Sequence, residues 1–432
     1  MEFHDVLHGH IQFSPTQGTT ALISDLLGSP EINRLRNMRQ MNFDVPLIQE
    51  LGRSRRLPHS IGVTHLATQL AQRDGLSTET TRVLVAAAML HDAAIPPYGH
   101  LVESEFENAG IDFRHEKRVA QLINGTVNAH NKYMALWPGK SLRVAEILSR
   151  YEVDSEQVIK AIRPHGKRTA ISADIDLDNI DNVHRMAVML GWDDAKQNML
   201  EIIKNSSLNS IGPIVFNQGA IQHLQKWMNF RQRIYTMIIA HPECVPYNAL
   251  QVDLVRAAVA ARIISPDDWW LSEPEFEDAM RHHEKTQALA KQLITGCDYQ
   301  LVDYAWFKDF VSPTKLNNLQ IANCMLENID IPAGFGHFVW NERKLITRRV
   351  RVSDESRRER EIGENSASCM IALVKRTTGR PKWTKSSSFE WRKQTVREFA
   401  NLFNVNDFQV EFPENYTGNF QNNNNELNLG YY

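Results

Sequence analysis

The chain has 432 residues, of which 42% are hydrophobic and 23% are charged, and its formal net charge is −3. This length and hydrophobic content exclude a disordered chain and allow a large core with a smaller appended domain. The near-neutral charge excludes a generally basic nucleic-acid-binding protein, so any such binding would need a local patch.

The cysteines and the N-terminal residues indicate the compartment. The four cysteines lack the spacing of a disulfide framework or of a zinc site, and they are Cys244, Cys297, Cys324 and Cys369. The first ten residues lack the basic and apolar regions of a signal peptide, and the longest apolar run, 83–90, is too short to cross a bilayer. We therefore expect a cytoplasmic protein that does not associate with membranes.

Helical periodicity dominates the chain up to about residue 330. Apolar residues recur at helical spacing in four segments, namely 61–70, 83–90, 180–187 and 250–261. From 331 the pattern changes: Gly334 and Gly336 interrupt it, and 345–352 and 370–374 are typical of strands. We predict a mostly α body over 1–330, a small α+β region over 331–412 and a flexible tail over 413–432.

Three predicted helix ends carry metal-binding residue types. His59 opens one helix, the His91-Asp92 pair ends an apolar helix just before Pro96, and a third helix is acidic. Asp174, Asp178 and Asp181 on that third helix are spaced i, i+4 and i+7, which places them on one face. Three like charges on one helix face are costly unless a cation offsets them, which favours a bound metal ion. The alternative interpretation is an acidic helix face exposed to solvent. Imidazole and carboxylate ligands suit a divalent Fe, Mn, Co, Ni or Zn ion.

Several segments, in order, resemble one known family. LHGHIQF, RLRNMRQM, HSIGV, LHD and DIDLDNID are similar to the HD-domain deoxynucleoside triphosphate triphosphohydrolases over roughly residues 4 to 285. That family includes bacterial dGTPases and an antiviral SAM and HD domain protein of vertebrates. The resemblance implies an HD-domain helical bundle, with its catalytic part at about 30–240, and a homo-oligomer. It implies metal ligation by His59, His91, Asp92 and Asp178, and hydrolysis of a nucleoside triphosphate, with Mg as a further ion on the nucleotide.

The resemblance also implies roles for residues around the metal. His100 matches the general acid, Glu103 would orient its imidazole, and His115 matches a further active-site histidine. The implied substrate contacts are Gln40, Arg56, Asp181 and Arg231, and the implied regulatory residue is Arg36.

The sequence departs from the family pattern near the substrate. Ile95 replaces a histidine, and Asn182, Met186 and Ile239 replace residues of the sugar pocket, while Gly28 replaces an aspartate of the regulatory site. These changes leave the choice of sugar and base open and speak against guanine activation.

The sequence is also compatible with three other functions. One alternative is a nucleotide-sensing or partner-binding module with a vestigial HD site, and another is an HD 5′-nucleotidase or phosphodiesterase. A third is nucleic-acid binding by the basic segments 343–360 and 375–393, which contain Trp383 and Trp391. A solvated or oligomer-facing surface is the simpler interpretation of those segments.

Overall fold

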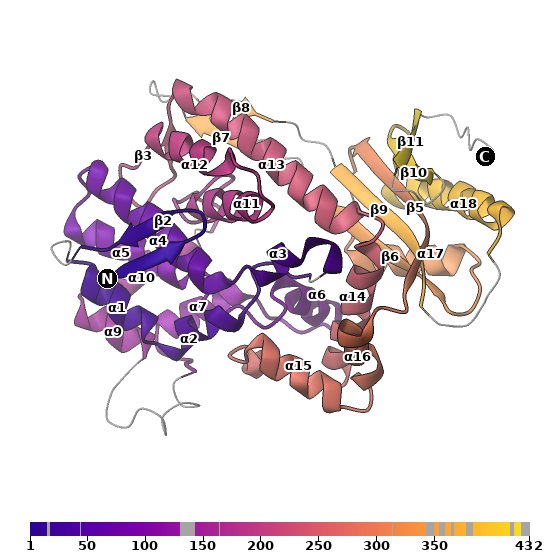
Figure 1. Cartoon of the computed structure of the whole chain (residues 1–432), viewed down its shortest axis with the longest axis horizontal. Coiled ribbons are helices and arrows are strands. Elements are labelled where there is room, and N and C mark those ends of the chain that lie inside the picture. The colour runs from indigo at the N-terminus through magenta and orange to yellow at the C-terminus, as the bar shows by residue number, and fades with distance from the viewer. Residues whose placement is uncertain are drawn as a thin grey trace.

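The structure is a computed structural model with a helical body and a C-terminal sheet (Figure 1). It describes residues 1–14, 18–43, 45–129, 143–163, 165–312, 314–342, 350–353, 359–363, 367–376, 383–414 and 419–424. The predicted class, mostly α with a small α+β region at the C-terminal end, is confirmed.

The chain starts with a β-hairpin that lies against the helical body (Figure 1). Its strands β1 (Glu2–Asp5) and β2 (Gly9–Gln12) pair antiparallel. Leu7, Ile11 and Phe13 are fully buried, so the hairpin is anchored by its apolar side chains. The short helices α1 (Thr20–Leu27), α2 (Pro30–Asn33) and α3 (Gln49–Arg53) follow, with 3₁₀ turns at Arg34–Asn37 and Pro46–Ile48.

The body is built around α4 (Arg56–Arg73), α5 (Thr78–Leu90) and α11 (Leu177–Met189). Residues 83–90 of α5 are fully buried, as expected for a helix that is apolar all round. The surrounding helices are α6 (His100–Asn108), α7 (His115–Ile123), α9 (Val144–Arg150), α10 (Ser155–Ile162), α12 (Ala195–Lys204), α13 (Ile221–Ala240), α14 (Val245–Ala260), α15 (Glu273–His282) and α16 (Gln287–Thr295). The short strands β3 (Ser206–Ser207) and β4 (Val215–Phe216) pair with each other.

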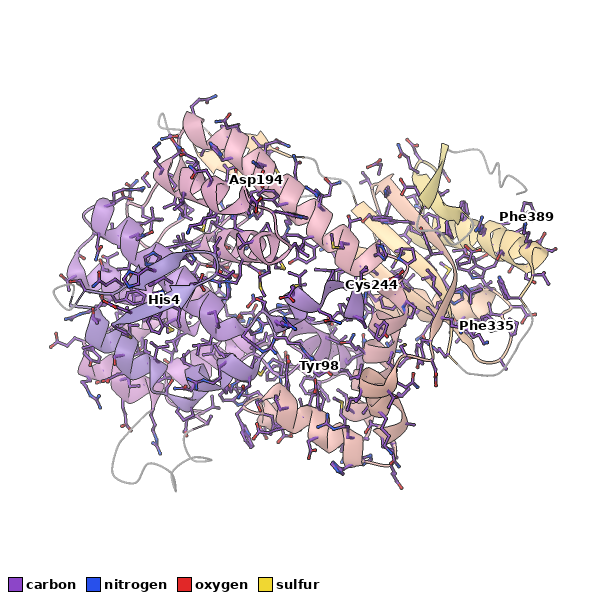
Figure 2. The ribbon with its side chains drawn as sticks, in the orientation of Figure 1. His4, Tyr98, Asp194, Cys244, Phe335 and Phe389 are labelled. Atoms are coloured by element: carbon purple, nitrogen blue, oxygen red, sulfur yellow. The ribbon has the colours of Figure 1, made fainter. Side chains whose placement is uncertain are left out.

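The C-terminal sheet has five antiparallel strands in the order β11-β10-β5-β9-β6. They are β5 (Gln300–Phe310), β6 (Phe335–Glu342), β9 (Ala367–Lys375), β10 (Gln409–Glu414) and β11 (Asn419–Asn424). Alternate residues of β9 belong to different cores: Met370 and Ala372 pack with the helical body, whereas Ile371 and Leu373 pack with α17 (Asn318–Asn328) and α18 (Lys385–Phe403). The sheet therefore lies between the body and these two helices. Figure 2 labels Phe335, at the start of β6, in this region and Tyr98 among the helices of the body.

The sheet begins earlier in the chain than 331, where the sequence placed the start of the α+β region. Its central strand β5 starts at Gln300, and Tyr304 and Phe307 within it are fully buried. A strand that is buried on both faces shows no apolar alternation, so its pattern cannot be distinguished from that of a buried helix.

The two strands expected from sequence are present where the structure describes them. Residues 370–374 lie in β9, and the end of 345–352 forms β7 (Val350–Ser353), which pairs with β8 (Glu359–Ile362). Residues 343–349, 354–358 and 377–382 of the basic segments lie outside the described residues, as do 415–418 and 425–432 of the predicted tail. Trp391 is 2% exposed in the core of the sheet region, so it offers no surface for base stacking. Within the described residues, no helix is both long and apolar enough to span a bilayer.

Candidate metal centre and active site

Three helix ends bring the predicted metal ligands together. His59 lies in the first turn of α4, and His91 follows the last residue of α5 as its C-cap. Asp178 lies in the first turn of α11, which starts where it does because the Asp176 carboxylate accepts a hydrogen bond from Asn179 N at 2.7 Å. The sequence prediction that these residues occupy helix ends is borne out by the helix bounds.

His59, His91 and Asp178 form a compact cluster whose potential ligand atoms all lie within 4.8 Å of one another. His59 Nε2 is 2.9 Å from Asp178 Oδ1, and His91 Nε2 is 3.8 Å from the same oxygen. His91 Nδ1 donates to the Ala88 carbonyl at 2.8 Å, so Nε2 is the ring nitrogen that faces the cluster. Nε2 is buried and has no hydrogen-bond partner. A buried imidazole lone pair beside a carboxylate fits a divalent metal ion.

The charges of the cluster also suit a cation. Burial alone would lower the pKa of His59, but hydrogen bonds to Asp178 and Asp181 raise it to about 9. Burial and the neighbouring charge of Asp178 raise the pKa of Asp176 to about 7. Asp178 and Asp181 thus favour a positive charge on the His59 ring, and a divalent metal ion at Nε2 could take the place of the proton that they stabilise there.

Asp92 lies beside this cluster but is held by an arginine. Its Oδ2 is 3.6 Å from His91 Nε2 and accepts a hydrogen bond from Arg56 Nη1 at 2.6 Å. Although burial opposes ionisation, Arg56 and the neighbouring histidines keep the pKa of Asp92 far below its usual range. Asp92 is therefore an ionised carboxylate at the edge of the cluster, and its role as a ligand remains a proposal.

Asp181 lies behind His59, which contradicts the substrate contact that we predicted for it. Its carboxylate has no exposed surface and bonds to His59 Nδ1 at 2.7 Å, to His8 Nε2 at 2.6 Å and to Arg185 Nε at 2.8 Å. Arg185 Nη1 in turn donates to Asp5 Oδ2 at 2.6 Å. Because Asp181 bonds to Nδ1, it orients the His59 ring so that Nε2 faces the cluster.

His8 and Asp5 were not predicted as site residues from the sequence. Both come from the N-terminal hairpin and meet residues about 170 to 180 positions later in the chain. Gly62 could have pointed to this contact from the sequence, because a glycine inside a helical pattern often marks a place where another segment packs closely against the helix. A Cβ atom at Gly62 would lie 2.2 Å from Asp181 Oδ2 and 2.6 Å from Arg185 Nη2, so the glycine makes room for this ion pair.

Asp174 does not share the helix face of the other aspartates, which corrects the sequence prediction. Helix α11 starts at Leu177, three residues after Asp174, because Asp176 caps it. Asp178 and Asp181 still converge, but on opposite ring nitrogens of the same histidine.

A second cluster joins the ends of α6 and α7. Glu103 Oε2 bonds to His100 Nδ1 at 2.7 Å, and Glu103 Oε1 accepts from the backbone N of His115 at 2.7 Å and from its Nδ1 at 3.0 Å. Burial opposes these charges, but the hydrogen bonds lower the pKa of Glu103 well below its usual range and raise that of His115 to about 9. The side chain of His100 is 58% exposed, so it is the member of the cluster that a substrate can reach.

A tight loop connects this cluster to the metal centre. Gly99 has a φ of 52°, and a Cβ atom there would lie 2.5 Å from Asn42 Oδ1 and 2.9 Å from Arg56 Nη2. The guanidinium that holds Asp92 thus packs directly against the residue that precedes His100. This packing fixes the position of His100 relative to Asp92.

The other predicted substrate residues are buried near the cluster. The Gln40 carbonyl accepts from Arg56 Nη2 at 3.4 Å, and Arg231 on α13 donates to Asn179 Oδ1 at 3.2 Å, next to Asp178. Arg36 is exposed and donates to Asn33 Oδ1 at 2.7 Å. Ile95, Met186 and Ile239, the departures noted in the sequence, are all buried and contribute apolar surface.

Comparison with known proteins identifies the region that contains the His59, His91 and Asp178 cluster. Residues 56–186 match the HD domain family model. The uncharacterized protein YwfO of Bacillus subtilis is 24% identical over 245 residues, which cover 56% of this chain and 52% of YwfO.

Two further relatives have a stated activity. The deoxynucleoside triphosphate triphosphohydrolase SAMHD1 homolog of Dictyostelium discoideum is 27% identical over 136 residues, covering 29% of this chain and 25% of that protein. SAMHD1 of Mus musculus, with the same stated activity, is 24% identical over 144 residues, covering 30% and 20%. The matched part spans about half or less of each relative. Together with the cluster, these matches support a metal-dependent phosphohydrolase of the HD type.

Proposed function

We propose that this HD-type phosphohydrolase cleaves nucleoside triphosphates, with or without a 2′-hydroxyl, to nucleoside and triphosphate. The observation that carries the proposal is the pairing of two clusters. The cluster of two buried histidines, His59 and His91, with the half-buried Asp178 has one imidazole nitrogen without a hydrogen-bond partner, and a short loop connects the cluster to the exposed His100. A metal site beside an accessible proton donor is what hydrolysis of a phosphate ester needs.

Each residue has a definable task in that reaction. A divalent metal held by His59, His91, Asp178 and Asp92 would supply Lewis acidity toward a phosphoryl oxygen. Glu103 accepts a hydrogen bond from His100 Nδ1. The other ring nitrogen, Nε2, is therefore the one that would donate a proton to the departing ester oxygen.

The triphosphate part of the proposal rests on the cations near the site and on the relatives. Two buried cations lie in this region, Arg56, which is paired with Asp92, and Arg231, which lies beside Asn179, and both would attract a polyphosphate toward the site. The Dictyostelium and mouse relatives, which match this part of the chain, are named as deoxynucleoside triphosphate triphosphohydrolases. We propose that Gln40 lies near the sugar, that Mg accompanies the nucleotide, and that the protein acts in the cytoplasm as a homo-oligomer.

Product analysis tests this function directly. The purified protein is incubated with dNTPs, NTPs and nucleoside monophosphates, with each of Mn, Fe, Co, Ni and Zn, and the products are separated by ion-exchange chromatography. We expect nucleoside and intact triphosphate in equal amounts, no products with Asp178→Ala, and unchanged products with the control Asp174→Ala. Turnover of monophosphates alone would replace the proposal with a nucleotidase. No turnover of any substrate, together with no bound metal by elemental analysis, would refute the enzyme.

A further inference from the structure

We propose that a groove along the outer edge of β6 binds a planar heteroaromatic ligand of the nucleobase class. The groove has a volume of about 230 Å³ and runs along residues 337–341. Leu101, Ser104 and Glu105 of α6 form one wall, and Leu319 and Ala322 of α17 form another. Neither described histidine-carboxylate cluster lines it, so the site is separate from the metal centre.

The register of β6 shows which backbone groups face the groove. β6 is the last strand of the sheet and pairs only with β9 among the described strands, with Phe335 opposite Lys375. The backbone N of Arg376 donates to the Gly334 carbonyl at 2.8 Å in the same register. Hydrogen-bonded pairs alternate along an antiparallel ladder, so the even-numbered residues of β6 bond to β9. The N–H and C=O groups of His337, Val339 and Asn341 therefore point away from the sheet.

Of these outward-facing backbone groups, the Asn341 N–H and the His337 carbonyl have hydrogen-bond partners, whereas those of Val339 between them have none among the described residues. The backbone N of Asn341 donates to Asn318 Oδ1 at 2.8 Å, and the His337 carbonyl accepts from Arg376 Nη2 at 3.5 Å. Between them lie the N–H and C=O of Val339, which is 5% exposed, and no described residue bonds to either group on this side. Buried backbone groups are nearly always hydrogen-bonded, so this donor and acceptor need a partner that enters the groove.

Aromatic side chains border the same groove. Phe43 and Trp340 meet edge to face with ring centroids 6.1 Å apart, and Phe338 also lines the space. The Nε1 of Trp340 is buried without a hydrogen-bond partner, which adds a second unused donor. Flat apolar walls with a few unused polar groups favour a planar ring that carries its own donors and acceptors.

The charges of the groove favour a neutral ligand over a phosphate. Arg256 is paired with both oxygens of Glu105 at 3.0 and 3.1 Å, and Arg376 Nε is 2.9 Å from Asp253 Oδ2. Both cations are thus neutralised by nearby carboxylates. The volume is below the roughly 300 to 1,000 Å³ of pockets for larger ligands. A single base or nucleoside, which offers an adjacent donor and acceptor to Val339, fits these conditions.

Calorimetric titration with adenosine, guanosine, cytidine and uridine in turn tests the proposal. Ser104→Trp and Leu319→Trp fill the groove from opposite walls, and Leu326→Trp is the matched control, because Leu326 is 56% exposed on the same helix α17 and outside the groove. Asp178→Ala separates the groove from the metal centre. Thermal unfolding of every variant, compared with the unchanged chain, shows that the fold is kept, and the two filling variants serve as independent tests.

We expect saturable binding of at least one nucleoside, weakened about tenfold or more by each folded filling variant. The same binding should persist in Leu326→Trp and in Asp178→Ala. The proposal is overturned if none of the four nucleosides binds, if binding is unchanged in a folded filling variant, or if Asp178→Ala abolishes it. A nucleoside is also the product of the proposed hydrolysis, so the filling variants decide whether the binding belongs to the groove, and product analysis tests the hydrolysis separately.

Discussion

Glu103 offers a quantitative test of the second cluster through the pH dependence of stability. Glu103→Gln removes the carboxylate that raises the pKa of the buried His115 from 6.5 to about 9. At about 1.36 kcal/mol per pH unit, this rise corresponds to about 3 kcal/mol of folding free energy. Because the pKa is raised in the folded state, that stabilisation is complete below pH 6.5 and is lost as the pH rises through about 9.

Urea unfolding of the unchanged chain and of Glu103→Gln near pH 6 and near pH 10 measures this contribution. We expect the difference in the free energy of unfolding between the two proteins to shrink by about 3 kcal/mol from the lower to the higher pH. Glu116→Gln is the control, since Glu116 is 42% exposed, lies 3.8 Å from His115 Nδ1 and should change the pH dependence little. Equal pH dependence in the unchanged chain and in Glu103→Gln would refute a charged His115.

Three other outcomes follow from the metal centre. Asp181→Asn should weaken Mn²⁺ binding by about 10- to 100-fold in a calorimetric titration, because the His59 ring loses the carboxylate that orients it. The control Asp174→Asn should bind Mn²⁺ as the unchanged chain does. Gly62→Ala should lower the free energy of unfolding by about 1 to 3 kcal/mol, because its Cβ would overlap Asp181; unchanged stability in urea unfolding would contradict the packing described. Saturating Mn²⁺ at 100 times its dissociation constant should stabilise the fold by about 2.7 kcal/mol in thermal unfolding, and no shift in the melting temperature would argue against a metal site.

The metal cluster could be predicted from sequence because its residues mark local events. His59 begins a helix, His91 ends one and Asp178 lies in a capped first turn, and each of these is visible in short-range patterns. The predicted position of Asp174 was wrong for a local reason as well, since the Asp176 side chain caps α11 and leaves Asp174 outside the helix. Helical periodicity alone does not show at which residue the helix begins, because that depends on which side chain caps it.

The residues that support the cluster could not be found in the same way. Asp5 and His8 lie in a hairpin far from α11 in sequence, and only the tertiary fold shows that they reach Arg185 and Asp181. The central strand β5 was missed because a strand buried on both faces loses its alternation. The groove beside β6 depends on strand register, which a single sequence does not specify when no hairpin turn connects the strands.

The long-range bonds of the N-terminal hairpin have a consequence for folding kinetics. The contacts of His8 with Asp181 and of Asp5 with Arg185 close loops of 173 and 180 residues. Contacts of such high sequence separation form late, since the chain entropy lost in closing the loop must be offset by structure already in place. The hydrogen-bonded support of the His59 imidazole is therefore completed only when the N-terminal hairpin has docked against α11. The rate at which the refolding chain acquires tight metal binding should then report the last stage of folding, after most helices have formed.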